Sequence, residues 1–326
     1  MKRLVWSAFV CLAFASSASN AQSISDQKQV VAFLFGTVHP VDSGGIPLKD
    51  PSGKPLALEQ PLGTAFFVSY PDKRGGPDYL FSYLVTAKHV LRDSDGKFLR
   101  AVNLRLNLKS ASGKGIEFVK DIPVSDANGS LLWFHDLKDN GDEAVVLPFL
   151  PDQAQFEFKT VPLAMFADDE TIKMEKLAEG DTLYFIGLMA QFYGSERNFP
   201  VIRRGTLALM TDEKMDTPWG PERAFIAELN SWPGNSGSPV FLNLSGFRDA
   251  GTIIGPPNIR FMGILLGNFQ NKLKATTVDS FTAVLGNDAN IGVSFMLPAS
   301  RVREVLEGGP AQQNRDIQIQ QLGRSR

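Results

Sequence analysis

A histidine, an aspartate and a serine each stand where an apolar segment begins or ends. They are His89 in LVTAKHV (84–90), Asp142 in GDEAVVLPF (141–149) and Ser236 in PGNSGSPVF (233–241). A serine hydroxyl becomes a good nucleophile only beside a positioned base, and the oxyanion it generates needs N–H donors. Gly234 and Gly237 flank Ser236, and glycine permits a turn tight enough to gather such donors. The pattern predicts acyl transfer by a serine, although a glycine-flanked serine is also typical of an ordinary turn.

The order of these residues along the chain restricts the fold. All three histidines, His39, His89 and His135, precede Ser236. An α/β-hydrolase needs its histidine after the serine, so that fold is excluded. The orders His-Asp-Ser and Asp-His-Ser both survive, but only the first places all three residues at the edges of strands.

Other polar residues near these segments favour structural roles. His39 precedes a proline at the end of an apolar segment, and His135 lies in a Trp-Phe-His-Asp sequence without matching flanks. We expect both histidines to be structural. Asp136 and Asp139 remain alternatives to Asp142 as the acid of the site.

The segments that surround these residues mostly have the pattern of strands. Segments rich in β-branched and aromatic residues recur between turn clusters, at 30–38, 63–70, 79–87, 99–108, 142–149, 182–189, 202–210, 223–229, 238–244, 259–267 and 290–298. Helices are predicted at Asp168–Leu177 and Ser300–Leu306. Residues 42–61 read as a long surface loop, 217–222 as a turn cluster, and the polar segment after Pro310 as a mobile tail.

Composition excludes several classes of protein. Of 326 residues, 43% are hydrophobic, which argues against wholesale disorder. The net charge of -2 argues against a nucleic-acid-binding surface. A single cysteine rules out a disulfide framework, a cysteine-rich zinc site and an iron–sulfur cluster. We expect no cofactor and no metal.

The first residues have the pattern of an export signal. A basic start (Met1–Arg3) precedes an apolar run (Leu4–Ala15) and the small-x-small sequence Ser19-Asn20-Ala21. The alternative is a membrane anchor, but the run is short for about 30 Å of hydrocarbon. We expect a signal peptide at 1–21 and an exported, periplasmic or secreted chain without a membrane anchor after cleavage. Cys11 would leave with the signal.

Four segments together resemble the motifs of the chymotrypsin-like (trypsin-like) serine peptidase family. They are Gly63–Val68 (GTAFFV), Thr86–Val90 (TAKHV), Asp142–Val146 (DEAVV) and Gly234–Pro239 (GNSGSP). The resemblance is closest to the disulfide-free bacterial branch, which includes Glu-specific endopeptidases and the protease domain of HtrA-type enzymes. It implies an all-β fold of two antiparallel six-stranded β-barrels with a short C-terminal helix. The barrels would span 22–155 and 156–297, with the helix and tail at 298–326.

The resemblance also implies a role for each residue. His89 would be the general base, Asp142 would orient its imidazole, and Ser236 would be the nucleophile. The backbone N–H groups of Gly234 and Ser236 would form the oxyanion hole. Glu143 stands where the family has an apolar residue, and strand alternation predicts that its side chain points away from Asp142.

By the same resemblance, the substrate pocket would involve Asn230, Leu266, Gly267 and Val293. None of them supplies a charge, which favours a neutral substrate side chain. The sequence thus predicts an exported serine endopeptidase that acts on protein or peptide substrates. The alternative is a catalytically dormant member of the same fold that serves as a binding protein. The sequence does not predict an oligomeric state.

Overall fold

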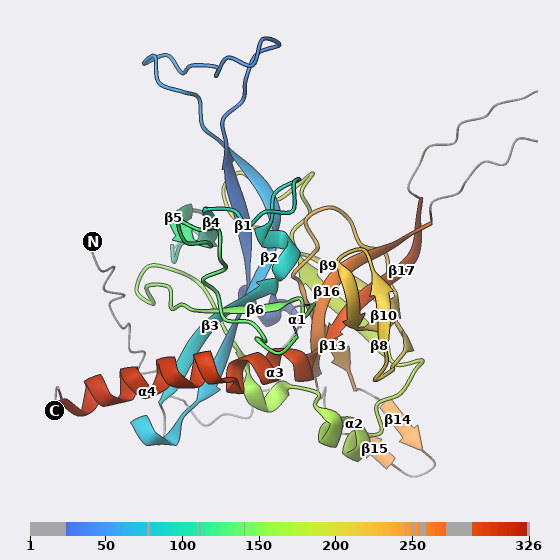
Figure 1. Ribbon diagram of the computed structural model, residues 1–326. Helices are drawn as coiled ribbons and strands as arrows, with labels where there is room; N and C mark the ends of the chain where they lie inside the picture. The colour runs from blue at the N-terminus through green and yellow to red at the C-terminus, as the bar shows by residue number, and fades with distance from the viewer. Residues whose placement is uncertain are drawn as a thin grey trace, which may run out of the picture.

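The structure is a computed structural model that describes residues 24–76, 79–110, 112–139, 141–244, 246–249, 252–254, 259–271 and 289–324. The chain forms two β-units side by side, and two C-terminal helices run along one side of the molecule (Figure 1). The predicted signal peptide lies outside the described residues.

The N-terminal unit is a sheet whose strands follow the order β5-β4-β1-β2-β3-β6, with β7 added in parallel to β2. Its strands are β1 (Val31–Val38), β2 (Leu58–Pro71), β3 (Leu80–Ala87), β4 (Ala101–Asn107), β5 (Ile116–Pro123), β6 (Ala144–Pro148) and β7 (Val161–Pro162). The other pairings are antiparallel. The apolar segments of β1, β2 and β3 are buried on both faces, which explains their nearly continuous hydrophobicity.

The C-terminal unit is a closed barrel in the order β12-β17-β16-β13-β8-β9. Its strands are β8 (Thr182–Gly187), β9 (Val201–Leu209), β12 (Phe225–Glu228), β13 (Pro239–Asn243), β16 (Ile259–Asn271) and β17 (Ala289–Pro298). Two hairpins stand outside the barrel: β10 (Lys214–Thr217) with β11 (Gly220–Arg223), and β14 (Gly246–Asp249) with β15 (Thr252–Ile254).

The helices are short except at the C-terminus. They are α1 (Ile24–Gln27), α2 (Asp169–Glu175), α3 (Ala299–Glu307) and α4 (Gly309–Arg324), with 3-10 turns η1 (Lys28–Val30), η2 (Lys73–Gly75), η3 (Lys88–Leu91) and η4 (Leu163–Met165). Asp168 caps α2 by accepting a hydrogen bond from the backbone N–H of Thr171 at 2.9 Å. None of the described helices is both long and apolar enough to cross a lipid bilayer.

The all-β class, one closed six-stranded barrel and the helix after the last strand are confirmed. Within the described residues, the N-terminal sheet has six strands along its pairing path, but β5 and β6 at its two ends are not paired with each other. The loop predicted at 42–61 is an exposed excursion between β1 and β2, and it forms the arm that projects from them in Figure 1. It ends earlier than predicted, because β2 begins at Leu58.

The C-terminal tail differs from its prediction, because residues 309–324 form helix α4 rather than a mobile segment. Arg315 explains why this polar helix docks. Its guanidinium donates to the hydroxyl of Tyr83 at 3.0 Å and to the carbonyl of Leu306 at 2.7 Å, and it lies 4.1 Å from the ring centroid of Tyr70. The apolar residues of α4 that pack on the core, Ala311, Ile319 and Leu322, stand among polar ones, so the sequence showed no apolar stripe. The buried Arg315 and the ion pair of Asp316 with Arg74 also hold the helix.

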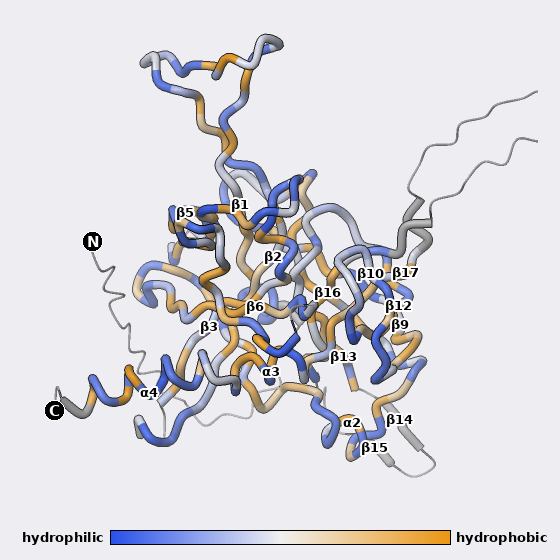
Figure 2. The backbone as a smooth tube through the Cα atoms, viewed as in Figure 1, coloured by the Kyte–Doolittle hydropathy of each residue, from blue (hydrophilic) through white to orange (hydrophobic). Residues whose placement is uncertain are grey.

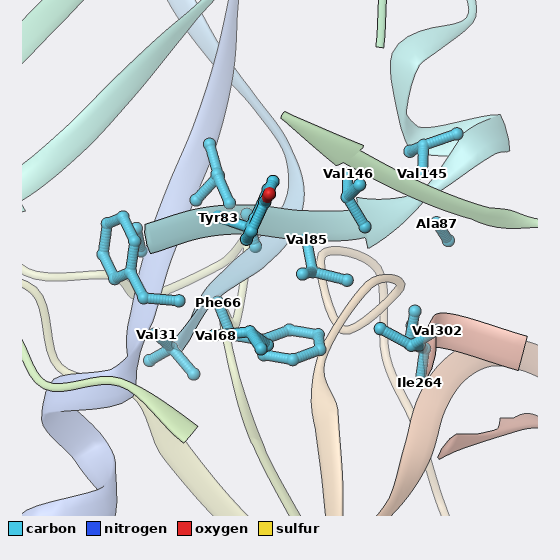
Figure 3. Close-up of a cluster of buried hydrophobic side chains, with 14 of the residues drawn as sticks. Val31, Phe66, Val68, Tyr83, Val85, Ala87, Val145, Val146, Ile264 and Val302 are labelled. Carbon is cyan, nitrogen blue, oxygen red and sulfur yellow. The ribbon is translucent and has the colours of Figure 1, made fainter. Parts of the chain in front are cut away.

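A shared hydrophobic core joins the two β-units. The ring of Phe66 on β2 lies 5.2 Å from that of Phe261 on β16, between ring centroids. Val302 of α3 lies beside Ile264 of β16 and near Val85 of β3 (Figure 3). Figure 2 shows that hydrophobic residues are concentrated in the strands of the two β-units. Burying a side chain of this size stabilises a fold by about 1.5–3 kcal/mol, so these contacts fix one unit against the other.

Candidate active site

The turn that carries Ser236 is fastened to the N-terminal unit through β2. The backbone N–H of Thr64 donates to the carbonyl of Ser236 at 2.9 Å, and its hydroxyl donates to the carbonyl of Gly234 at 2.9 Å. Gly63 permits this approach, since a Cβ there would come within 2.9 Å of the Ser236 carbonyl oxygen and 2.7 Å of Val90 Cγ1. A strand of one unit thereby sets the position of the serine carried by the other.

The turn itself depends on its two glycines. Gly234 has φ +94° and Gly237 has φ +85°, values that side chains rarely adopt. A Cβ on Gly237 would come within 2.1 Å of the carbonyl oxygen of Thr64. Among the described residues, neither the backbone N–H of Gly234 nor that of Ser236 has a hydrogen-bond acceptor. Both predicted oxyanion donors are therefore free to bind a ligand oxygen.

The imidazole of His89 is held by Glu143. His89 lies in η3, directly after β3. The Oε2 atom of Glu143 accepts from the backbone N–H of His89 at 2.9 Å and lies 2.7 Å from its Nδ1. Glu143 is only 4% exposed, so this contact is shielded from water. With Nδ1 engaged, Nε2 is the nitrogen left for proton transfer.

The structure does not bring the predicted Asp142 to His89. The Oδ1 atom of Asp142 accepts from the N–H of Ala144 at 2.9 Å, and its Oδ2 accepts from Nη2 of Arg301 at 3.0 Å. The physical reason is the alternation of side chains in extended backbone, because the two neighbouring carboxylates face different ways and His89 lies on the side of Glu143. Burial raises the pKa of Asp142 to about 6, against the opposing effects of the Ala144 N–H and Arg301.

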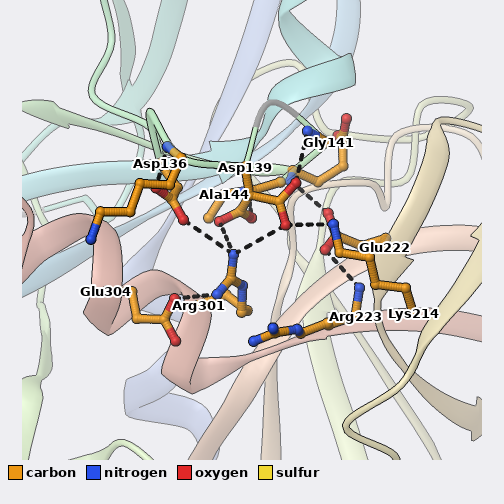
Figure 4. A network of polar contacts seen from close by, with 12 residues as sticks. Asp136, Asp139, Gly141, Ala144, Lys214, Glu222, Arg223, Arg301 and Glu304 are labelled. Atoms are coloured by element: carbon orange, nitrogen blue, oxygen red, sulfur yellow. Dashed lines mark hydrogen bonds and ion pairs between the residues drawn. The ribbon is translucent and has the colours of Figure 1, made fainter.

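The two alternative acids, Asp136 and Asp139, also contact Arg301. Its Nη2 lies 3.4 Å from Asp136 Oδ2 and 3.8 Å from Asp139 Oδ2, while its Nη1 pairs with Glu304 (Figure 4). Asp139 also accepts from Nζ of Lys214 on β10 at 2.7 Å. This cluster ties α3 and the β10–β11 hairpin to the segment that precedes β6.

Glu222 on β11 is a further buried carboxylate beside this cluster. It is 1% exposed, and its Oε2 accepts from the backbone N–H of Glu143 at 2.9 Å. Burial, and then the neighbouring charge of Asp142, raise the pKa of Glu222 to about 7. Glu143, whose side chain contacts His89, is thus held at its backbone N–H by the Glu222 side chain of the C-terminal unit.

The serine and the histidine are not hydrogen-bonded to each other in this conformation. The hydroxyl of Ser236 donates to the carbonyl of Leu266 at 2.7 Å. The Nε2 atom of His89 is buried and has no hydrogen-bond partner. The indole of Trp219 stacks on the imidazole, with ring centroids 4.3 Å apart and an interplanar angle of 18°.

The four predicted pocket residues lie on or next to the strands β12, β16 and β17. Leu266 and Gly267 lie on β16 beside the serine turn, where Leu266 has no partner on β17 because of a bulge. Asn230 follows β12, and Val293 on β17 pairs with Glu228 of β12.

A polar cluster of Ser231, Asn268 and Ser294 lies next to these residues. The hydroxyl of Ser231 donates to Oδ1 of Asn268, which also accepts from the hydroxyl of Ser294 at 3.0 Å. The amide of Asn268 in turn donates to the Ser231 carbonyl at 3.0 Å.

Three residues of the site were missed or misjudged in the sequence. Glu143 was recognised only as a departure from the family pattern. Glu222 and Trp219 fall in a segment that was predicted to be a turn cluster. A buried acid and a tryptophan within a polar turn were the available signals, but only the tertiary structure shows where they lie.

Comparison with known proteins finds no matching family model and no match among curated proteins. Among solved structures, the chain is similar to an HtrA-type protease, AlgW, with a decapeptide (14% identity, TM-score 0.47, covering 89% of this chain and 67% of that one). It is also similar to the MamO protease domain from Magnetospirillum magneticum (12%, TM-score 0.44, covering 87% and 98%). A third is an inactive serine-to-alanine form of Rv3671c from M. tuberculosis H37Rv (13%, TM-score 0.39, covering 91% and 96%).

Proposed function

We propose that this protein is a chymotrypsin-like serine endopeptidase with Ser236 as nucleophile, His89 as general base and Glu143 as the group that orients the base. The observation that carries the proposal is the 2.7 Å contact between His89 Nδ1 and Glu143 Oε2, next to a serine turn whose two N–H donors are unoccupied. A buried acid on one ring nitrogen and a free second nitrogen are what a general base of this kind requires.

The reaction follows from these positions once the Ser236 hydroxyl turns from the Leu266 carbonyl to His89. Nε2 takes the hydroxyl proton as Oγ attacks the peptide carbonyl, and the N–H groups of Gly234 and Ser236 bind the oxyanion. His89 then gives its proton to the departing amine, which leaves an acyl-serine. A water molecule, deprotonated by the same imidazole, releases the acid. Glu143 stabilises the imidazolium at each stage.

The substrate in this proposal is an extended peptide with a neutral side chain at the cleavage position. The carbonyl of Leu266, a residue without a partner on β17, accepts the Ser236 hydroxyl in this conformation. Once that hydroxyl turns toward His89, the carbonyl can accept a peptide N–H, in the manner of a strand added to a sheet edge. The nearby polar groups of Ser231, Asn268 and Ser294 are uncharged, which is why we propose a neutral side chain. We also propose export, which rests on the signal-peptide pattern at 1–21.

A fluorophosphonate probe tests the nucleophile directly, because it forms a covalent adduct with an activated serine. We expect an adduct at Ser236 in the wild-type chain, located by peptide mass mapping, and none in Ser236→Ala. Ser238→Ala is the matched control, since its buried hydroxyl has no hydrogen-bond partner and its removal should leave the turn intact. Lack of an adduct in the wild-type chain and in the Trp219→Ala variant introduced below would contradict the proposal.

A second candidate is a dormant peptidase fold that binds peptides without cleaving them. The observation in its favour is that Ser236 bonds to Leu266, while Nε2 of His89 is buried without a partner and Trp219 stacks on the imidazole. Calorimetry and fluorophosphonate labelling together separate the two candidates. A dormant fold would bind peptides in calorimetry, while Ser236 would stay unlabelled by fluorophosphonate in every variant.

A further inference from the structure

The hairpin β10–β11 places one tryptophan over the candidate active site. Thr217 and Gly220 pair at the end of the hairpin, so Pro218 and Trp219 form its turn. The hydroxyl of Thr217 braces that turn by donating to the Gly220 carbonyl at 2.7 Å. The hairpin pairs with no other strand among the described residues, so its position is set by its continuity with β12 and by contacts outside strand pairing.

The indole fills the space between the general base and β16. One face stacks on His89, with ring centroids 4.3 Å apart, and one edge meets the ring of Phe295 at 6.5 Å. On the far side it covers Gly267, where a Cβ would come within 2.7 Å of Trp219 Cη2. A peptide lying along β16 toward Ser236 must pass through this space. The indole and such a peptide therefore exclude each other.

The same hairpin is attached to the segment that carries the orienting acid. Glu222 accepts the backbone N–H of Glu143 at 2.9 Å, and Lys214 pairs with Asp139 at 2.7 Å. The carbonyl of Pro221 would lie 3.0 Å from a Cβ on Gly141, so the two backbones touch there. These contacts hold the strands of the hairpin, whereas its turn contacts His89, Phe295 and Gly267 through the indole of Trp219.

Two features of the site accompany the indole over His89. Nε2 of His89 is shielded from solvent and unpaired, which costs free energy in any folded protein. The hydroxyl of Ser236 is bonded to a carbonyl that a substrate N–H could use. Both features are those of a site whose reacting groups are in place but whose substrate-binding space is closed to a peptide.

We infer that the β10–β11 hairpin is an autoinhibitory latch, with Trp219 as the plug that occupies the substrate's place over His89 and Gly267. Peptide binding requires the indole to swing out while Glu222 keeps the base of the hairpin in position. The inference rests on the proposed peptidase function, since it names what keeps that site closed. Only the fraction of molecules with an open latch can react, so apparent rates scale with that fraction.

Acylation of His89 by diethyl pyrocarbonate tests the latch without requiring catalysis. The reagent modifies an accessible imidazole nitrogen, and peptide mass mapping gives a rate for each histidine separately. We expect His89 to react at least about tenfold faster in Trp219→Ala than in the wild-type chain, because the open fraction limits the wild-type rate. Exposed His39 serves as an internal reference and should react equally in both.

Two further variants complete the experiment. Asp216→Ala changes an exposed residue of the same hairpin and keeps the indole, so His89 should react as in the wild-type chain. Trp219→Phe keeps an aromatic ring of smaller area and should give an intermediate rate. It also carries the test if Trp219→Ala does not fold, as judged by circular dichroism.

The outcomes separate the latch from the peptidase proposal. Equal acylation of His89 in the wild-type chain and both Trp219 variants overturns the latch, even if Ser236 is labelled by fluorophosphonate. Faster acylation of His89 without any adduct at Ser236 supports the latch and overturns the peptidase function. Faster acylation together with faster fluorophosphonate labelling of Trp219→Ala supports both.

Discussion

At the scale of single residues, two adjacent carboxylates have separate tasks. Glu143 uses one oxygen atom to bind both the backbone N–H and the ring nitrogen of His89. Asp142 faces Arg301 and is fully buried. The first contact fixes the orientation of a ring, while the second holds helix α3 against the N-terminal sheet. Substitutions at these neighbouring positions should therefore change different properties of the protein.

We expect Glu143→Gln to lower kcat by about 10⁴-fold, the cost of replacing the orienting acid of a serine peptidase triad with its amide. KM and the melting temperature should change little, because glutamine keeps the size and the acceptor oxygen. Steady-state kinetics on a peptide substrate, together with thermal melting, would measure both effects.

Asp142→Asn should have the opposite profile. It leaves Nη2 of Arg301 without its nearest carboxylate, and we expect a loss of roughly 1–3 kcal/mol in the free energy of unfolding. Turnover per folded molecule should stay within about tenfold of wild type, as expected for a residue that does not touch the reacting groups. A 10⁴-fold loss of kcat here, with normal turnover in Glu143→Gln, would return the orienting role to Asp142.

At the scale of elements, the long apolar strands were predictable and the polar ones were not. The segments 63–70 and 79–87 appear as β2 and β3, because burial on both faces leaves a continuous hydrophobic run. The hairpin β10–β11 has short strands with a proline and a glycine, so its pattern was read as a turn. The alternation of side chains predicts that Glu143 and Asp142 point to opposite sides of the chain. Which of the two points toward His89 depends on the direction that the chain takes from β3 into η3.

The buried Glu222 makes stability depend on pH in a defined direction. Its pKa is raised to about 7 in the folded chain, above the ordinary value of 4.5. The folded state therefore keeps a proton that the unfolded state releases. This contribution to stability is fully present below pH 4.5 and is lost as the pH rises through 7. Asp142 and Arg301 face the same carboxylate, the first opposing its ionisation and the second favouring it.

We expect Glu222→Gln to remove this contribution to the pH dependence. Glutamine carries no charge and keeps one acceptor oxygen, whereas the N–H groups of Glu143 and Arg223 bond to different oxygens of Glu222. Losing one of these hydrogen bonds lowers the melting temperature of the variant by the same amount at every pH. The melting temperature of the variant relative to wild type should therefore rise from pH 5 to pH 8, which melting curves across that range measure. A difference that stays constant or falls over this range would show that the fold does not disfavour the ionised carboxylate.

At the scale of the whole molecule, the two β-units share their core. Phe261 of β16 lies 5.2 Å from Phe66 of the N-terminal sheet and 4.7 Å from Phe166, between ring centroids. Thr64 fastens the serine turn across the same boundary. The sequence placed a boundary near residue 155, but the contacts make each unit part of the environment that the other needs. The candidate active site lies where they meet, so its geometry depends on their remaining together.

We expect the two units to unfold together in the wild-type chain and in Phe261→Ala. Truncating this ring leaves a cavity bordered by both units and should cost about 3–5 kcal/mol in the free energy of unfolding. If the core is shared, hydrogen exchange in β3 and in β13 should accelerate by the same factor, because both strands open only in global unfolding. Tyr184→Phe, a buried change that removes a hydroxyl bonded to Gln27 of α1, is the comparison for a milder loss. If exchange accelerates in β13 while β3 keeps its protection, the two units are separately stable. The position of Ser236 relative to His89 would then depend on Thr64 and α3 alone.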